Sequence, residues 1–273
     1  MSNKCLKNYD LGNDVYSQSF LKHKQVMMTL TEIAQEVLIA GQEMPIITLL
    51  TFKDEIIALN YNKTNENKNG IHHGEYLTFR SLPAEFIEKH IEEVTLYVNV
   101  EPCIMCESMI QQMGVKQVVF GCENERFGAS LLPDKTNHAN NLQMIPYILR
   151  KESIITLRQF YLQENKNAPK TRRKEGRLLD LNEFPSLHWK SYFTCFEKFA
   201  SVVFDSKKIQ LEDAKKIYFN DLDLEEIQMD LIKLKSSDAE YKESKNLLDK
   251  IETQVIEFWL SWKEPKKRKS IVK

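Results

Sequence analysis

Two short motifs constrain this chain more than any other feature: His-Gly-Glu at 73–75 and Pro-Cys-Ile-Met-Cys at 102–106. Cys103 and Cys106 are separated by the helical spacing that places both thiols on one helix face. Histidine and cysteine are the side chains that bind zinc, and three protein ligands leave one tetrahedral position open, as in catalytic sites. The two motifs therefore predict a zinc ion (Zn²⁺) held by His73, Cys103 and Cys106.

The residues around the cysteines indicate where the thiols lie. The run 94–100 is rich in β-branched and aromatic residues and is typical of a buried strand. Pro102 suits the first turn of a helix, where its missing N–H costs nothing. We therefore expect both thiols at a helix N-terminus, whose partial positive charge favours the thiolate. A Cys-x-x-C pair alone is more often a structural half-site or a redox pair; the order of the two motifs and the proline favour the catalytic interpretation.

Glu75 is the candidate acid and base of the site. It lies two residues beyond His73, and residues at that spacing do not share a helix face. We expect the first motif to open a helix, with Glu75 beside the metal but not bound to it. A carboxylate in that position can take a proton from water and return it to a ring nitrogen and a departing amine. Only His73 has the spacing required, so His72 is expected in the loop or at the pocket edge.

Composition excludes several classes of protein. The chain has 273 residues, 42% hydrophobic and 28% charged, with a net charge of −1, which is typical of a globular protein. Its polar first residues and the lack of a long apolar run predict neither a signal peptide nor a membrane span. Three scattered thiols remain beside the two ligands, which favours a reducing compartment. We therefore predict a cytoplasmic and/or nuclear protein with no membrane partner.

Periodicity predicts alternating helices and strands. We expect a helix that ends at Gly41, a hairpin of strands 46–52 and 55–60, strands 94–100 and 117–122, a helix stop near Gly114, and a helix over 146–163. This order predicts an α/β protein whose sheet is largely parallel beyond the hairpin. We expect the linker-like segment 165–179 to divide a zinc-dependent catalytic domain (1–179) from a mainly helical C-terminal extension with a basic tail (180–273). Apolar stripes at 224–234 and 247–260 predict packing helices there.

The chain resembles a known family in its central region. The segments Leu-Tyr-Val-Asn-Val-Glu-Pro-Cys-Ile-Met-Cys (96–106), Val-Val-Phe-Gly-Cys (118–122), Asn-Glu-Arg-Phe-Gly (124–128) and Ala-Pro-Lys (168–170) are similar to those of the catalytic subunits of eukaryotic heterodimeric tRNA-specific adenosine deaminases, in a fungal form. The H-x-E and P-C-x-x-C motifs are those of zinc nucleobase deaminases. The resemblance covers roughly residues 20 to 180.

The resemblance carries specific expectations. It implies a three-layer α/β/α sandwich of the cytidine-deaminase type with a mixed, mostly parallel sheet. It also implies conversion of the wobble adenosine of tRNA anticodons to inosine, with Glu75 as the proton carrier. The partner implied is a homologous noncatalytic deaminase subunit that lacks this glutamate. Asn62 matches a base-contacting asparagine, although asparagine is also common in turns after strands. Gly74 departs from the usual Ala-His-Ala-Glu, and we expect it to loosen the backbone.

Two basic clusters are candidates for tRNA contact, because the chain as a whole is not basic. Alternatives are solvated tails or, for the second cluster, a nuclear-import signal. The candidate residues are Lys170, Arg172, Arg173 and Lys174 after the deaminase domain, and Lys266, Lys267, Arg268 and Lys269 in the tail. Two other functions stay open: deamination of a free base or nucleotide (cytidine, deoxycytidylate or guanine) and a noncatalytic zinc scaffold.

Overall fold

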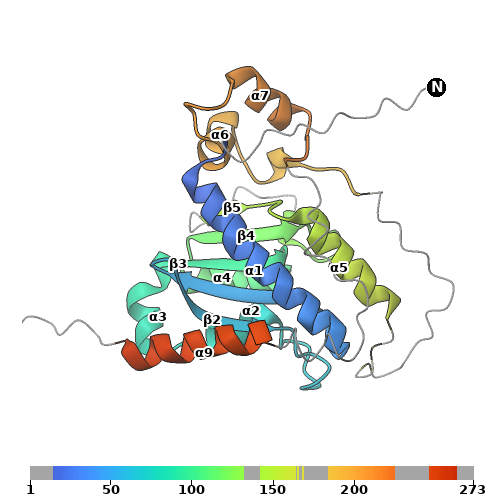
Figure 1. Ribbon diagram of the computed structural model, residues 1–273, viewed down its shortest axis with the longest axis vertical. Coiled ribbons are helices and arrows are strands. Elements are labelled where there is room, and N and C mark those ends of the chain that lie inside the picture. The colour runs from blue at the N-terminus through green and yellow to red at the C-terminus, as the bar shows by residue number, and fades with distance from the viewer. Residues whose placement is uncertain are drawn as a thin grey trace, which may run out of the picture.

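A computed structural model describes residues 15–131, 142–163, 165, 168, 184–224 and 246–262. In this part of the chain five strands form one mixed sheet in the order β2-β1-β3-β4-β5 (Figure 1). The strands are β1 (Ile47–Phe52), β2 (Glu55–Tyr61), β3 (Val94–Val100), β4 (Gln117–Cys122) and β5 (Gln143–Ile145). The predicted hairpin and the strands 94–100 and 117–122 are confirmed.

Strand β1 runs against all the others. It pairs antiparallel with β2 and with β3, whereas β3 with β4 and β4 with β5 pair in parallel. Four strands therefore share one direction, which confirms a mixed sheet of mostly parallel strands. The prediction that the sheet is largely parallel beyond the hairpin is confirmed for β3, β4 and β5, and the β1–β3 pair that joins them to the hairpin is antiparallel. The hairpin places β2 at the edge and leaves β1, which runs the opposite way, against β3.

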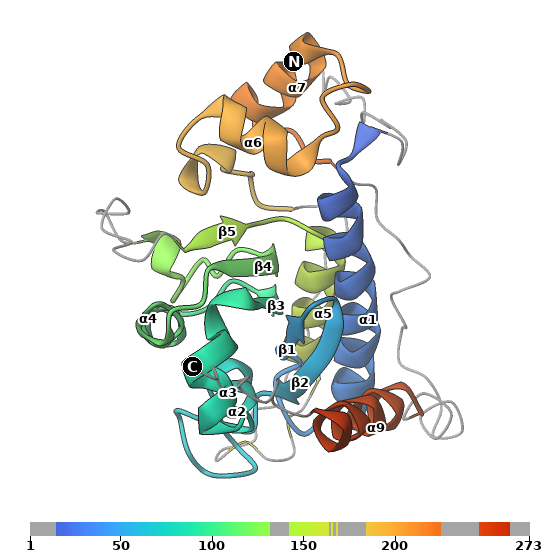
Figure 2. The same ribbon diagram turned by 90° about the vertical axis from the view of Figure 1, so that its left-hand side faces the viewer.

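Helices cover both faces of the sheet and make three layers (Figure 2). On one face lie α1 (Gln18–Ala40) and α5 (Arg150–Leu162); on the other lie α2 (Gly74–Arg80), α3 (Ala84–His90) and α4 (Ile104–Met113). Alternate strand side chains enter two separate cores, because successive residues of a strand face opposite ways. Leu49, Tyr97 and Val119 pack beneath α1, whereas Leu50, Leu96 and Val118 pack beneath the other three helices.

Turn residues end the elements where the sequence predicted. Gly41 after α1 and Gly114 after α4 have φ of 65° and 90°, the left-handed conformation that glycine adopts at helix ends. Lys53 and Asp54 also have positive φ, as a two-residue hairpin requires. Helix α1 begins eight residues before the predicted apolar pattern, because Ser17 caps it by accepting a hydrogen bond from Phe20 N.

Helix α5 begins later than predicted, at Arg150 rather than near residue 146. Tyr147 and Leu149 have φ of 71° and 53°, which is incompatible with a right-handed helix. The backbone N–H groups of Tyr147 and Ile148 instead donate to the carbonyls of Gly121 and Phe120. The segment after β5 therefore follows β4 before the helix can begin.

The described segments of the C-terminal region are mainly helical, as expected. Helices α6 (Phe196–Val203) and α7 (Leu211–Phe219) lie beyond β5, beside the start of α1, whereas α9 (Asn246–Ser261) lies along β2 (Figure 1). The apolar stripe predicted at 224–234 lies outside the described residues apart from Leu224, which is buried. In the described segments, no helix combines the length and the apolar character that crossing a bilayer requires.

His23 links α1 to the sheet in a way that depends on pH. Its Nδ1 is hydrogen-bonded to the Tyr97 hydroxyl of β3 at 2.8 Å, and its Nε2 lies 3.2 Å from Ser19 Oγ. Burial lowers the pKa of His23 from 6.5 to about 4, because the charged imidazolium is poorly solvated in the core. The folded state therefore keeps this histidine neutral at pH values where the unfolded chain protonates it.

We expect the free energy of unfolding to fall as the pH drops from 6.5 towards 4. In that window the unfolded chain binds a proton that the folded chain does not, and the pKa difference corresponds to about 3 kcal/mol. The variant His23→Gln should be less stable at pH 7 but show a shallower decline on acidification. Urea unfolding at several pH values measures both slopes; parallel curves would contradict the assignment.

Candidate active site

Both sequence motifs open helices at the same end of the sheet, where β2 and β3 finish. His73 immediately precedes α2, and Cys103 immediately precedes α4. The two helices follow β2 and β3, and these strands run in the same direction because β1 is antiparallel to each. The first turns of α2 and α4 are thereby brought together, as the metal prediction required.

Three side chains form a compact metal-binding group. The sulfurs of Cys103 and Cys106 each lie 3.5 Å from His73 Nδ1, and all three ligand atoms are within 4.8 Å of one another. Typical zinc–sulfur and zinc–nitrogen bonds place tetrahedral ligands about 3.6 Å apart. Spacing and donor chemistry therefore both fit zinc, and among the described residues this is the one such group of three.

The two thiols of the group differ in acidity. The hydrogen bond from Cys106, reinforced by one with His73, lowers the pKa of Cys103 to about 4. The same bond with Cys103, together with burial, raises the pKa of Cys106. The lowered pKa of Cys103 favours its thiolate, the form in which cysteine binds a metal.

His72 lies outside this group. Its Nδ1 and Nε2 are 2.9 Å and 3.1 Å from the side-chain amides of Asn67 and Asn69, and its ring stacks on that of Tyr76. Both ring nitrogens are therefore engaged by the asparagine-rich loop. The structure places this residue in the loop that leads into α2, where the sequence expected it.

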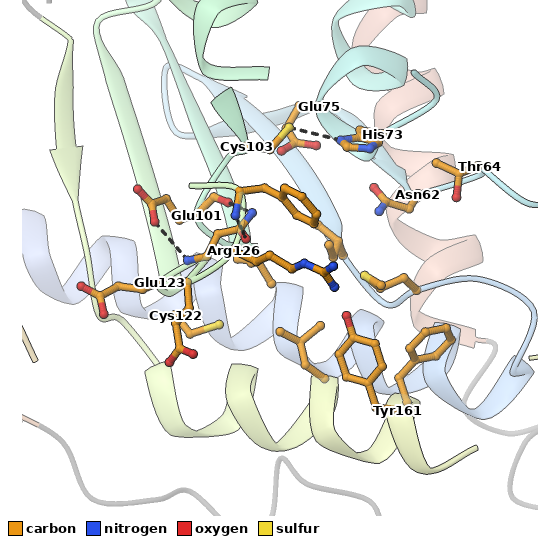
Figure 3. Close-up of a pocket in the computed structure, with 18 of the residues that line it drawn as sticks. Asn62, Thr64, His73, Glu75, Glu101, Cys103, Cys122, Glu123, Arg126 and Tyr161 are labelled. Atoms are coloured by element: carbon orange, nitrogen blue, oxygen red, sulfur yellow. Dashed lines mark hydrogen bonds between the residues drawn. The ribbon is translucent and has the colours of Figure 1, made fainter. Parts of the chain in front are cut away.

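Glu75 is buried beside the metal-binding group. Its side chain is 3% exposed, and its Oε2 has no hydrogen-bond partner among the described residues. Figure 3 shows Glu75, His73 and Cys103 gathered at one end of the pocket. Burial raises the pKa of the Glu75 carboxyl, so this group holds a proton more readily than an exposed glutamate does. An unpartnered oxygen at this position is available to water or substrate.

Asn62 is buried next to the start of α2. Its Oδ1 accepts a hydrogen bond from Gly74 N at 2.8 Å, which leaves its Nδ2 as a donor without a partner in the described structure. A Cβ at Gly74 would lie 2.8 Å from Thr48 Oγ1. The backbone here is therefore packed against β1 and tied to Asn62, rather than loosened by glycine as we expected.

The metal-binding group lies in a large open pocket of about 840 Å³, within the range of ligand sites. Tyr161 of α5 stands across the pocket from the metal ligands (Figure 3). The sequence did not identify the contributions of α5, because nothing in its periodicity distinguishes a pocket-facing side chain from a packed one. The lining beyond the predicted residues includes Ile46, Glu123, Arg126, Phe127, Arg158 and Tyr161.

Glu101 anchors the loop that forms one wall of this pocket. Its buried carboxylate accepts hydrogen bonds from Asn124 N, Ser130 N and Ser130 Oγ, each at 3.0 Å. The carbonyl of Phe127 accepts from Ile104 N at 2.9 Å, which ties the same loop to the first turn of α4. We call residues 123–130 the site loop. Sequence reasoning missed Glu101, although an acidic residue between a buried strand and Pro102 was a usable signal.

The basic residues of the 170–174 cluster and of the 266–269 tail lie outside the described residues.

Known deaminases are similar to the first part of this chain. The family model for MafB19-like deaminases matches residues 21–157. The tRNA-specific adenosine deaminase subunit tad2 of Schizosaccharomyces pombe is 32% identical over 162 residues, which cover 58% of this chain and 42% of that protein. The tRNA-specific adenosine deaminase 2 of Danio rerio is 34% identical over 177 residues, which cover 60% of this chain and 82% of that protein. A solved tRNA:A34 deaminase structure overlaps 48% of this chain and 97% of its own, with a TM-score of 0.41 and 21% identity.

The metal assignment predicts different zinc contents for variants of the two adjacent histidines. His73→Ala should abolish stoichiometric zinc, because it removes one of three ligands. His72→Ala should retain zinc, because His72 contacts only the loop asparagines and Tyr76. Elemental analysis of the two purified variants provides the comparison. Equal zinc loss in both would show that the loop, rather than a single ligand, determines binding.

Proposed function

Because this chain belongs to the tRNA-specific adenosine deaminase 2 family of MafB19-like deaminases, we propose that it converts adenosine to inosine at the wobble position of tRNA anticodons. The reaction is hydrolytic: water adds oxygen to C6 of the adenine ring, and the 6-amino group leaves as ammonia. The observation that carries this proposal is the buried Glu75 carboxyl, with one unpartnered oxygen, beside His73, Cys103 and Cys106.

The metal ligands and Glu75 have different roles in the proposed reaction. His73, Cys103 and Cys106 hold the zinc ion, which when bound acts as a Lewis acid and makes water a better nucleophile at neutral pH. Glu75 Oε2 accepts the proton that the attacking water loses and passes it to the ring nitrogen N1. It then accepts the remaining hydroxyl proton and delivers it to the departing amine. Burial supports both steps, since the raised pKa of Glu75 suits a group that gains and loses a proton.

Asn62 is proposed to orient the base. Its Oδ1 is occupied by Gly74 N, so the free Nδ2 is a donor suited to an acceptor nitrogen on the adenine ring. The reacting base must leave its stack to enter this pocket, and an anticodon loop presents unstacked bases at low cost. The pocket, at about 840 Å³, has room for more than one base.

Partner and location follow from the same proposal. We propose a homologous noncatalytic subunit as partner, and tRNA contacts by Lys170, Arg172, Arg173 and Lys174 and by Lys266, Lys267, Arg268 and Lys269. Such contacts would supply the positive charge that a chain with a net charge of −1 otherwise lacks. A cytoplasmic and/or nuclear location suits a tRNA substrate. The division at residue 179 is proposed as a boundary in sequence between the catalytic domain and its extension.

Glu75→Gln tests the chemistry. The amide keeps the shape of the side chain but cannot accept and return a proton, so inosine formation should fall by about 10³-fold. Zinc content should be unchanged, because Glu75 is outside the ligand group. Inosine in the anticodon of a tRNA substrate is measured alongside zinc in the same preparations.

The wild-type protein, combined with its partner, separates the alternative functions. Conversion of free cytidine, deoxycytidylate or guanine with tRNA left untouched would replace the proposal with a free base or nucleotide deaminase. Full tRNA deamination by the Glu75→Gln variant would instead favour a noncatalytic zinc scaffold.

Asn62→Asp tests the role in base binding separately from the fold. The carboxylate retains an oxygen that accepts from Gly74 N, but it replaces the Nδ2 donor with a second acceptor. We expect zinc binding to be retained and kcat/KM for tRNA to fall by about 100-fold, the scale of losing a hydrogen bond and gaining a repulsion. Asn62→Ala, which loses both interactions, is the companion variant. Undiminished kcat/KM in the aspartate variant would assign Asn62 to the loop alone.

A further inference from the structure

We propose that the C-terminal extension positions the site loop (123–130), which lines the catalytic pocket. It does so through its own residue Tyr192 and through Tyr147 of the core. This inference rests on the proposed deaminase function for its kinetic consequence. The family match ends at residue 157, so the segment 184–224 of the extension lies outside it. Tyr192 and its neighbours in this segment are therefore outside the region that the family model matches.

The segment 184–224 is fixed to the deaminase core at both of its ends. At its start, the buried Arg150 of α5 donates a hydrogen bond from Nη2 to the carbonyl of Pro185. At its end, Asp223 forms ion pairs with Arg150 and with Lys151, the latter at 3.3 Å, and Tyr16 donates to the Leu224 carbonyl at 2.8 Å. These contacts place the extension firmly against the core.

An aromatic cluster fills the space between the extension and the core. Trp189, which is 1% exposed, packs edge-on against Tyr147 with ring centres 4.8 Å apart. Tyr192 packs in the same way against Tyr147 and, at 5.2 Å, against Phe120 of β4. The rings hold both tyrosine hydroxyls in one place, because neither side chain can rotate within such a packed layer.

The two hydroxyls meet at Glu123, the first residue of the site loop. Tyr147 donates to Glu123 Oε1 and accepts from His188 N of the extension at 3.0 Å. The Tyr192 hydroxyl donates to the same oxygen at 3.4 Å. The extension therefore holds the loop at Glu123, directly through Tyr192 and indirectly through the His188 N–H on Tyr147.

The contacts bear on the substrate pocket because of what the loop carries. Glu123, Arg126 and Phe127 line the pocket, and the Phe127 carbonyl accepts from Ile104 N beside the metal ligand Cys103. Glu101 fixes the same loop from the core side. With both supports in place the loop is ordered before substrate binds, so binding does not have to supply the cost of ordering it.

Tyr192→Phe and Tyr147→Phe test the proposal, because each removes one hydroxyl and keeps the ring. Hydrogen exchange of peptides covering 123–130 should be about fivefold faster in each variant, the effect of one hydrogen bond. KM for tRNA should rise by about the same factor while kcat and zinc content stay unchanged, since the loop contributes binding rather than proton transfer.

Tyr218→Phe is the matched control. Tyr218 is a buried tyrosine of the same extension, but its hydroxyl donates to the Phe193 carbonyl at 2.9 Å, within the extension itself. Loop exchange and KM should match the wild type in this variant. Equal loop exchange in all four proteins would overturn the proposal, as would faster exchange with an unchanged KM. Absence of inosine formation by the wild type would overturn only the proposed function, because the exchange experiment uses no tRNA.

Discussion

The antiparallel pairing of β1 with both of its neighbours is the constraint on which the site depends. Because β1 is antiparallel to β2 and to β3, those two strands run in the same direction, and their carboxyl ends lie at the same end of the sheet. The helices that follow them start side by side, with His73 before one and Cys103 before the other. Ligands that are 30 residues apart in sequence are thereby held 3.5 Å apart.

The site places metal-binding thiols next to a buried carboxyl group. A thiolate at Cys103 suits the metal, whereas the buried Glu75 has a raised pKa and an oxygen without a partner. Leaving a polar atom unsatisfied in the interior costs stability. The fold offsets that cost through the two cores on either side of the sheet and through Asn62, which satisfies the backbone of Gly74. The same arrangement keeps a proton carrier next to the substrate.

Sequence reasoning succeeded where a local pattern decides the structure. The strands 94–100 and 117–122 are continuous apolar runs, and the metal ligands follow from spacing and residue type alone. It failed where the cause is distant in sequence. Three features depend on contacts between remote segments. They are the pairing of β1 with β3, the late start of α5 at Arg150, and the hydrogen bonds from the site loop to Glu101. The Tyr192 contact with Glu123, 69 residues away, could not be inferred from either segment.

Helix α9 has a consequence for how the molecule can assemble. It lies along β2, one of the two edge strands, and the indole of Trp259 donates to the Ile57 carbonyl at 2.8 Å. The Leu248 N–H near the other end of this helix is held by the Glu36 carboxylate of α1. Unpaired backbone groups on an outer strand otherwise invite a foreign strand to join. A second polypeptide therefore cannot extend the sheet past β2 without first displacing α9 and breaking the hydrogen bond of Trp259.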